Sequence, residues 1–129
     1  MTWTVEFHVE FELEFDQLAE EVQNELLAYA QLLEHFRPML KRPHVDTLKG
    51  SKHSNLKELR FDAADGVWRV AFAFDPLRRA ILLVAGDKSG SSEKRFYKAL
   101  IKKAETRFDA HLIQLKEQGE KNDNAEAKA

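Results

Sequence analysis

Three apolar segments separated by two short turns, between residues 56 and 86, constrain the fold of this chain more than any other feature. The segments are LKELRF (56–61), VWRVAFAF (67–74) and AILLVAG (80–86). Their β-branched and aromatic side chains, bounded by the turn sequences DAADG and DPLR, are typical of strands. In the first turn we expect Asp65 and Gly66 to supply the positive φ angles. The sequence therefore predicts an antiparallel meander whose last strand, apolar on both faces, lies inside a sheet.

A strand and two helices are predicted on either side of this meander. The opening WTVEFHVE alternates apolar and polar residues, with Trp3, Val5, Phe7 and Val9 on one face, which is the period of a strand. From Asp16, a suitable N-cap, apolar residues at steps of three and four predict a helix to about Phe36. The same spacing after Ser92 predicts a last helix with the stripe Tyr97, Ile101, Ala104, Phe108, Leu112 and Leu115.

The order of these elements predicts one α+β domain over residues 1–116. In it, an N-terminal and a C-terminal helix pack against a curved, mainly antiparallel sheet. Residues 37–55 show neither period and are expected to form a long loop. Residues 117–129 have no apolar period, and we expect a disordered tail there.

Composition limits the kinds of functional site that the chain can contain and indicates its cellular compartment. The chain has no cysteine, so disulfides and thiolate zinc sites are excluded. The five histidines lack metal-ligand spacing, and we expect neither a metal nor another cofactor. No segment reaches the roughly 18–20 apolar residues that span a bilayer, and no basic segment followed by an apolar one opens the chain. We therefore expect a cytoplasmic protein that contacts no membrane.

Charge is divided sharply along the chain. Residues 1–36 hold nine acids and no Lys or Arg, whereas residues 37–103 hold sixteen Lys and Arg against seven acids. Such a basic middle segment suits a polyanionic partner, and a solvated surface facing acidic neighbours is the alternative.

Strand alternation indicates where these cations lie. Arg69 shares a face with the small residues Ala71 and Ala73, which leaves room beside it. The face of Arg60 depends on the register of the hairpin and stays open. Lys88 follows the central strand.

Arg95 and Lys98 lie in the first turns of the last helix, where cations oppose the helix dipole. A bound phosphate there would relieve this opposition, and side chains that point into solvent are the alternative. In the loop, His53 lies among Lys49, Lys52, Lys57 and Arg60, cations that favour its neutral form. A histidine without a chemical role is equally compatible with this position.

Four segments in order resemble a known family: LKGSKHSNLKELRF, WRVAFAFDP, AILLVAGDKSG and KRFYKALIKKAETRFDAHL. Over about residues 3–115 they are similar to the phage-derived, HigB-type branch of the RelE/ParE superfamily of type II toxin-antitoxin toxins. The resemblance implies a fold like that of microbial ribonucleases. It also implies mRNA cleavage on the translating ribosome without a metal, and inhibition by an antitoxin that often carries a helix-turn-helix.

The resemblance gives the candidate residues their roles. Arg60, Arg69 and Lys88 are assigned to phosphate and transition-state stabilisation, and Tyr97 to proton transfer or base stacking. His53, Lys52 and Lys57 are candidates for the general base or for RNA contacts. Lys49, Arg95 and Lys98 are further candidates for RNA contacts. A core role for Tyr97 is equally compatible with its place in the apolar stripe.

Two alternatives come from the same fold. A ParE-like toxin would bind DNA gyrase without catalysis, and its charged helices would form the contact surface. An inactive phage-derived copy would be harmless when expressed.

Overall fold

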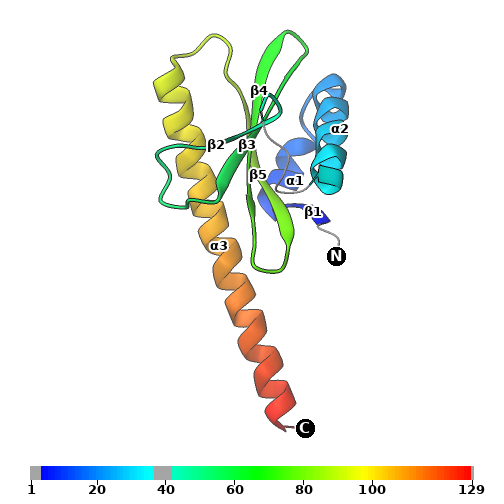
Figure 1. The fold of residues 1–129 in the computed structure, drawn as a ribbon, viewed down its shortest axis with the longest axis vertical. Helices are drawn as coiled ribbons and strands as arrows, with labels where there is room; N and C mark the ends of the chain where they lie inside the picture. The colour runs from blue at the N-terminus through cyan, green and yellow to red at the C-terminus, as the bar shows by residue number, and fades with distance from the viewer. Residues whose placement is uncertain (1–3, 37–41, 129) are drawn as a thin grey trace.

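A five-stranded sheet forms the centre of the protein in a computed structural model that describes residues 4–36 and 42–128, with side chains as far as Glu120 (Figure 1). The strands are β1 (Thr4–Phe7), β2 (Val45–Thr47), β3 (Leu56–Ala63), β4 (Gly66–Phe74) and β5 (Arg79–Asp87). Their order is β1-β5-β4-β3-β2, and every neighbouring pair is antiparallel except β1 and β5, which are parallel. The α+β class and the meander β3-β4-β5 are confirmed.

The hairpin between β3 and β4 has a two-residue turn that determines the register. Ala64 and Asp65 carry the positive φ angles, 50° and 62°, so the expectation for Gly66 was wrong. Gly66 instead lies against side chains, because a Cβ there would be 2.7 Å from Oδ2 of Asp87, which would have to shift. With Ala63 opposite Gly66, Arg60 lies directly opposite Arg69. The two arginines therefore share a face.

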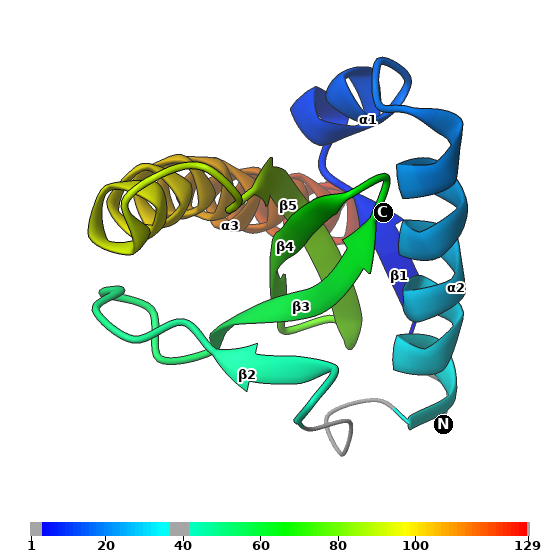
Figure 2. The same ribbon diagram turned by 90° about the horizontal axis from the view of Figure 1, so that it is seen from above.

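Three helices cover the sheet: α1 (Val9–Phe15), α2 (Glu20–Phe36) and α3 (Glu93–Lys128). Figure 2 shows α2 and α3 on opposite sides of the sheet. The core on the side of α1 and α2 includes Leu26, Leu33, Val70, Phe72 and Leu82. The core under α3 includes Ala71, Ala73, Leu83, Ala104 and Phe108. The predicted alternation along β4 is confirmed, and its two alanines allow α3 to lie close to the sheet.

The N-terminal segment differs from the expected single strand and helix. The strand ends at Phe7, and α1 follows with His8 as its N-cap, whose Nδ1 accepts from Glu10 N at 3.2 Å. Asp16 is the C-cap of α1 and not the start of the long helix. VEFELEF alternates as a strand does, but Phe11 and Phe15 are four residues apart and both pack on Phe7. The segment fits both the strand period and the helix period, and the contacts with Phe7 of β1 favour the helix.

Two further expectations need correction. The segment expected to be a loop contains β2, which pairs with β3 and buries Val45, and residues 37–41 lie outside the described residues. The expected tail after residue 116 continues α3 to Lys128. That segment has no Pro, so elongation of the established helix continues through it despite the low helix propensity of Gly119, Asn122 and Asn124.

No helix among the described residues is both long and apolar enough to cross a membrane.

Candidate functional site

Four of the predicted residues meet on the α3 side of the sheet. Arg60 comes from β3, Arg69 from β4, Lys88 from the end of β5 and Tyr97 from the second turn of α3. We call these four residues the cation cluster. Nζ of Lys88 lies 5.9 Å from the centre of the Tyr97 ring. Four consecutive elements thus bring three cations and one phenol together.

Local contacts explain this convergence. The Lys88 N–H donates to Val67 O at 2.7 Å, which ties the end of β5 to the start of β4. Ser92 then begins α3, since its carbonyl accepts from the Phe96 N–H at 2.9 Å. Tyr97 follows immediately and faces the sheet, half-buried among the residues of the α3 core. Its place in the apolar stripe and its place in the cluster are therefore compatible.

Glu58 connects the members of the cluster. The Tyr97 hydroxyl donates to Glu58 Oε1 at 3.1 Å and accepts from Arg69 Nε at 3.3 Å. Nη1 of Arg60 lies 3.6 Å from the same Glu58 oxygen. Glu58 is 3% exposed and Arg69 6%, so both charges are buried. Opposed arginines repel each other, and the carboxylate beside them offsets that repulsion.

Burial controls the protonation of this group. It raises the pKa of Glu58, although the Tyr97 hydrogen bond and the two arginines act in the opposite direction. It also raises the pKa of Tyr97, so the phenol is protonated at neutral pH. Oε2 of Glu58 is buried and has no hydrogen-bond partner among the described residues. An incompletely satisfied carboxyl with a raised pKa is a suitable proton acceptor.

Arg60 is the more accessible arginine, with 28% of its side chain exposed. It lies 3.4 Å from Asp46 Oδ2 on β2. Asp46 also accepts from Arg42 Nε at 3.0 Å, and this hydrogen bond lowers the pKa of Asp46. Lys88 similarly pairs with Glu93 at 3.2 Å. Both outer cations thus have acidic partners, the partly buried Asp46 and the exposed Glu93, that an incoming phosphate could replace.

His53 is not part of the cation cluster. Its Nε2 lies 2.7 Å from Asp109 Oδ1, and its ring packs edge-on against Phe108. Asp109 is twelve residues beyond Tyr97 on α3, roughly 18 Å along a helix that rises 1.5 Å per residue. The Lys52 ammonium also bonds Asp109, and these contacts lower the pKa of that carboxyl. The structure therefore separates His53, which the sequence predicts as a candidate catalytic residue, from the cation cluster.

The other candidate RNA contacts are dispersed. Lys57 alternates with Glu58 on β3 and therefore faces the α2 side, where its Nζ lies 3.4 Å from Thr47 Oγ1. Lys49 is exposed in the loop that Lys52 and His53 fasten to α3. Arg95 and Lys98 are exposed near the start of α3, at the same end as Lys88. Among these candidates, only this last pair lies at the end of α3 that also carries Tyr97.

Sequence reasoning missed Glu58 and Asp46. Glu58 was identifiable, because it lies two residues before Arg60 on a predicted strand and so shares its face. Asp46 was not, because no periodic pattern indicated β2. Within the described parts of the chain, no group of three or more His, Cys, Asp or Glu side chains is arranged to hold a metal ion.

The fold matches those of two solved RelE structures. A double mutant of the E. coli toxin RelE in the free state matches with a TM-score of 0.56 and 12% identity, over 78% of this chain and 95% of that one. A chain of the archaeal RelE-RelB complex from Pyrococcus horikoshii OT3 matches with a TM-score of 0.51 and 20% identity, over 70% and 100%. At these identities the likeness establishes the fold alone.

Sequence comparison identifies the family. The model described as "Phage derived protein Gp49-like (DUF891)" matches residues 13–109. HigB2 of Mycobacterium tuberculosis, named as a candidate toxin, is 42% identical over 93 residues, which are 71% of this chain and 46% of HigB2. HigB3 of the same organism, similarly named, is 47% identical over 81 residues, 63% of this chain and 68% of HigB3.

The chain therefore belongs to the Gp49-like family of RelE/HigB-type toxins, as the resemblance indicated. The region that it shares with HigB2 is about half the length of that protein.

Proposed function

We propose that this protein is the toxin of a type II toxin-antitoxin system and that it cleaves mRNA on the translating ribosome. The observation that carries the proposal is the cation cluster, in which Arg60, Arg69 and Lys88 surround the phenol of Tyr97. Cleavage of RNA without a metal requires a proton acceptor, a proton donor and cations near the phosphorus. The cluster and Glu58 contain all three.

The proposed reaction begins at the ribose 2′-hydroxyl. Its oxygen attacks the phosphorus while its proton passes to the Tyr97 oxygen, and the phenolic proton passes to Glu58 along their 3.1 Å hydrogen bond. The bond between phosphorus and the 5′-oxygen breaks, and the Lys88 ammonium protonates that oxygen. Arg60 stabilises the charge on the non-bridging oxygens. Arg69 is buried and acts as a positioning residue through its contact with Tyr97.

The partners proposed with this activity are the ribosome, mRNA and a cognate antitoxin of helix-turn-helix type, in the cytoplasm. A RelE-type chain in complex with RelB supports the antitoxin. The exposed Arg95 and Lys98, at the end of α3 that also carries Tyr97, support contact with RNA phosphates.

Mapping the 5′ ends of cellular transcripts after brief induction tests the proposal. We expect growth arrest together with new 5′ ends inside coding regions. Arrest with intact mRNA would contradict it, and inhibition of purified gyrase would then favour the ParE-like alternative. Harmless expression without any antitoxin would indicate an inactive copy.

A further inference from the structure

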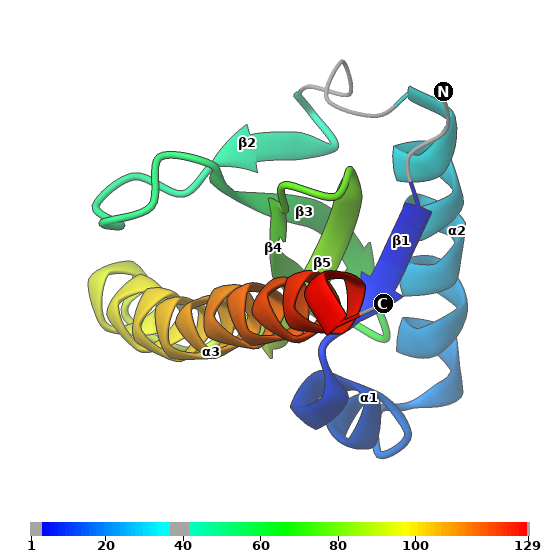
Figure 3. The same ribbon diagram turned by 90° about the horizontal axis from the view of Figure 1, so that it is seen from below.

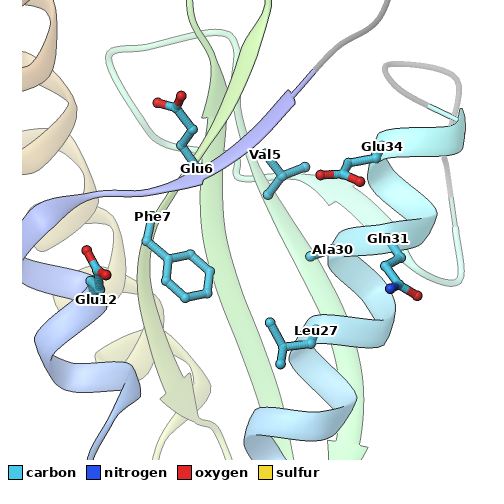
Figure 4. Close-up of a pocket in the computed structure, with 8 residues that line it drawn as sticks. All are labelled: Val5, Glu6, Phe7, Glu12, Leu27, Ala30, Gln31 and Glu34. Atoms are coloured by element: carbon cyan, nitrogen blue, oxygen red, sulfur yellow. The ribbon is translucent and has the colours of Figure 1, made fainter.

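A groove lies between β1 and α2, on the other side of the sheet from the cation cluster (Figure 4). Its volume is about 680 Å³, within the range of ligand-binding clefts. Its apolar lining consists of Val5, Phe7, Leu27 and Ala30. Leu27 is 45% exposed, although its neighbours Leu26 and Leu33 on α2 are buried. The groove thus offers apolar surface that the described residues leave uncovered.

Acidic side chains line the rest of the groove. Glu6 comes from β1, Glu12 from α1 and Glu34 from α2, with Gln31 beside them, and no lining residue is a cation. Glu6 pairs with Arg79 at 3.3 Å, so Glu12 and Glu34 contribute most of the negative charge. The surrounding chain is also acidic, with nine acids and no Lys or Arg in residues 1–36. Such a site repels anions, including RNA, and attracts a positively charged partner. The groove is therefore complementary to a segment that is both basic and apolar.

The backbone of β1 indicates that the partner segment should be extended. β1 is the last strand on its side of the sheet, and Figure 3 shows it at the edge beside α2. The N–H groups of Thr4 and His8 donate to β5, to Arg78 O and Leu82 O. Because alternate residues of a strand bond to opposite sides, Val5 and Phe7 direct their N–H and C=O groups to the open edge.

We propose that this groove binds an extended, basic segment of a partner protein, which pairs with the open edge of β1 as an additional strand. Its apolar side chains, at alternate positions, lie on the face of Val5 and Phe7 and enter the groove. Its alternating Lys and Arg side chains point to the face of Glu6, which already pairs with Arg79 at 3.3 Å. Cations that flank the apolar residues at the ends of the segment lie within reach of Glu12 and Glu34. This surface is separate from the cation cluster, so the proposal does not depend on RNA cleavage.

Fluorescence anisotropy tests what kind of segment the groove binds. Three labelled heptapeptides are titrated with the full chain. The first alternates Lys with Val or Leu, the second has Glu in place of Lys, and the third has Ser in place of the apolar residues. We expect only the first to bind. If the Lys and Ser peptide binds equally well, diffuse charge explains the attraction and the proposal is wrong.

Matched variants test whether the first peptide binds in the groove. Leu27→Asp should weaken binding of the first peptide at least tenfold, and Leu13→Asp, an exposed leucine that does not line the groove, by less than twofold. Glu34→Lys should weaken it more than Glu25→Lys, another exposed acid of α2. Thermal melting confirms that all four variants are folded. Equal effects within either pair would overturn the assignment to the groove.

Amide hydrogen exchange tests the strand pairing. Binding of the first peptide should slow exchange of the Val5 and Phe7 amides, which face the open edge, and change the Thr4 amide little, because it already bonds to β5. Binding that leaves the Val5 and Phe7 amides unprotected would rule out an added strand.

Discussion

The two sides of the sheet bury different kinds of side chain. The side of α1 and α2 is closed by large apolar residues, among them Phe11, Leu26 and Phe72. All four charged residues identified as buried within the described chain belong to α3 or contact it, namely Glu58, Arg69, Asp75 and Arg107. A buried charge reduces stability unless it is paired, whereas buried apolar surface increases it. We infer that the α2 side contributes mainly stability, whereas the α3 side combines a buried apolar core with the charged groups of the candidate site.

The comparison predicts its largest effect at Phe72, which is fully buried on the α2 side. Phe72→Ala should lower the free energy of unfolding by about 3–5 kcal/mol, because it creates a cavity in the core. Urea denaturation measures this loss. Toxicity should fall only as far as the folded fraction does. A loss below about 1 kcal/mol would show that this side does not dominate stability.

Substitutions of Arg60 and Lys88 should lower the cleavage rate strongly and change stability little, the reverse of the Phe72 substitution. Arg60→Ala and Lys88→Ala should each lower the rate of mRNA cleavage by about 10²–10³-fold, because each removes a cation that stabilises the transition state. Their stability should change by about 1 kcal/mol or less, since both side chains are partly exposed. Lys94→Ala, an exposed neighbour on α3, is the matched control. If both variants keep their toxicity, the site has been misplaced.

Glu58→Gln should change both stability and mRNA cleavage, and its effect on stability should depend on pH. Burial raises the pKa of Glu58, so the folded protein holds this proton more tightly than the unfolded chain does. The Glu58 contribution to stability therefore decreases as pH rises above the ordinary glutamate value of 4.5.

Denaturation of the wild type and of Glu58→Gln at a series of pH values isolates this contribution. The stability of the variant relative to the wild type should increase with pH across that window and then become constant. A difference that does not change with pH would contradict the burial argument. Cleavage by Glu58→Gln should fall because the proposed proton acceptor is lost.

The smallest effect is expected at Lys98, which is exposed near the cluster. If it contacts one RNA phosphate, Lys98→Ala should reduce the salt dependence of ribosome association by about one unit of log-log slope. The control is Lys57→Ala, because Lys57 lies on the other face of the sheet. Identical slopes for the wild type and for both variants would place the RNA elsewhere.

The meander and the α3 stripe could be predicted because their periods are uninterrupted and their neighbours are local in sequence. α1 could not, because VEFELEF fits both periods and its contacts with Phe7 decide. β2 has three residues and forms only by pairing with β3. Short elements that form through contacts with other elements have little periodic sequence pattern of their own.

The site was predictable to a similar extent. Arg60 and Arg69 were identified, and the position of the turn alone would have shown that they share a face. The separation of His53 was not predictable, because it depends on which turn of α3 lies beside the loop. Proximity in sequence to cations was therefore a poor guide to proximity in space.

Cleavage by Tyr97→Phe in a purified translation system tests the central claim most directly. This change removes only the hydroxyl that links Arg69 to Glu58. The mRNA should be cleaved at least about 100-fold more slowly than by the wild type. Tyr29→Phe, which alters a half-buried tyrosine stacked on Phe61 on the other side of the sheet, should cleave at the wild-type rate. Equal rates for the two variants would contradict the assignment of the α3 side as the site of RNA cleavage.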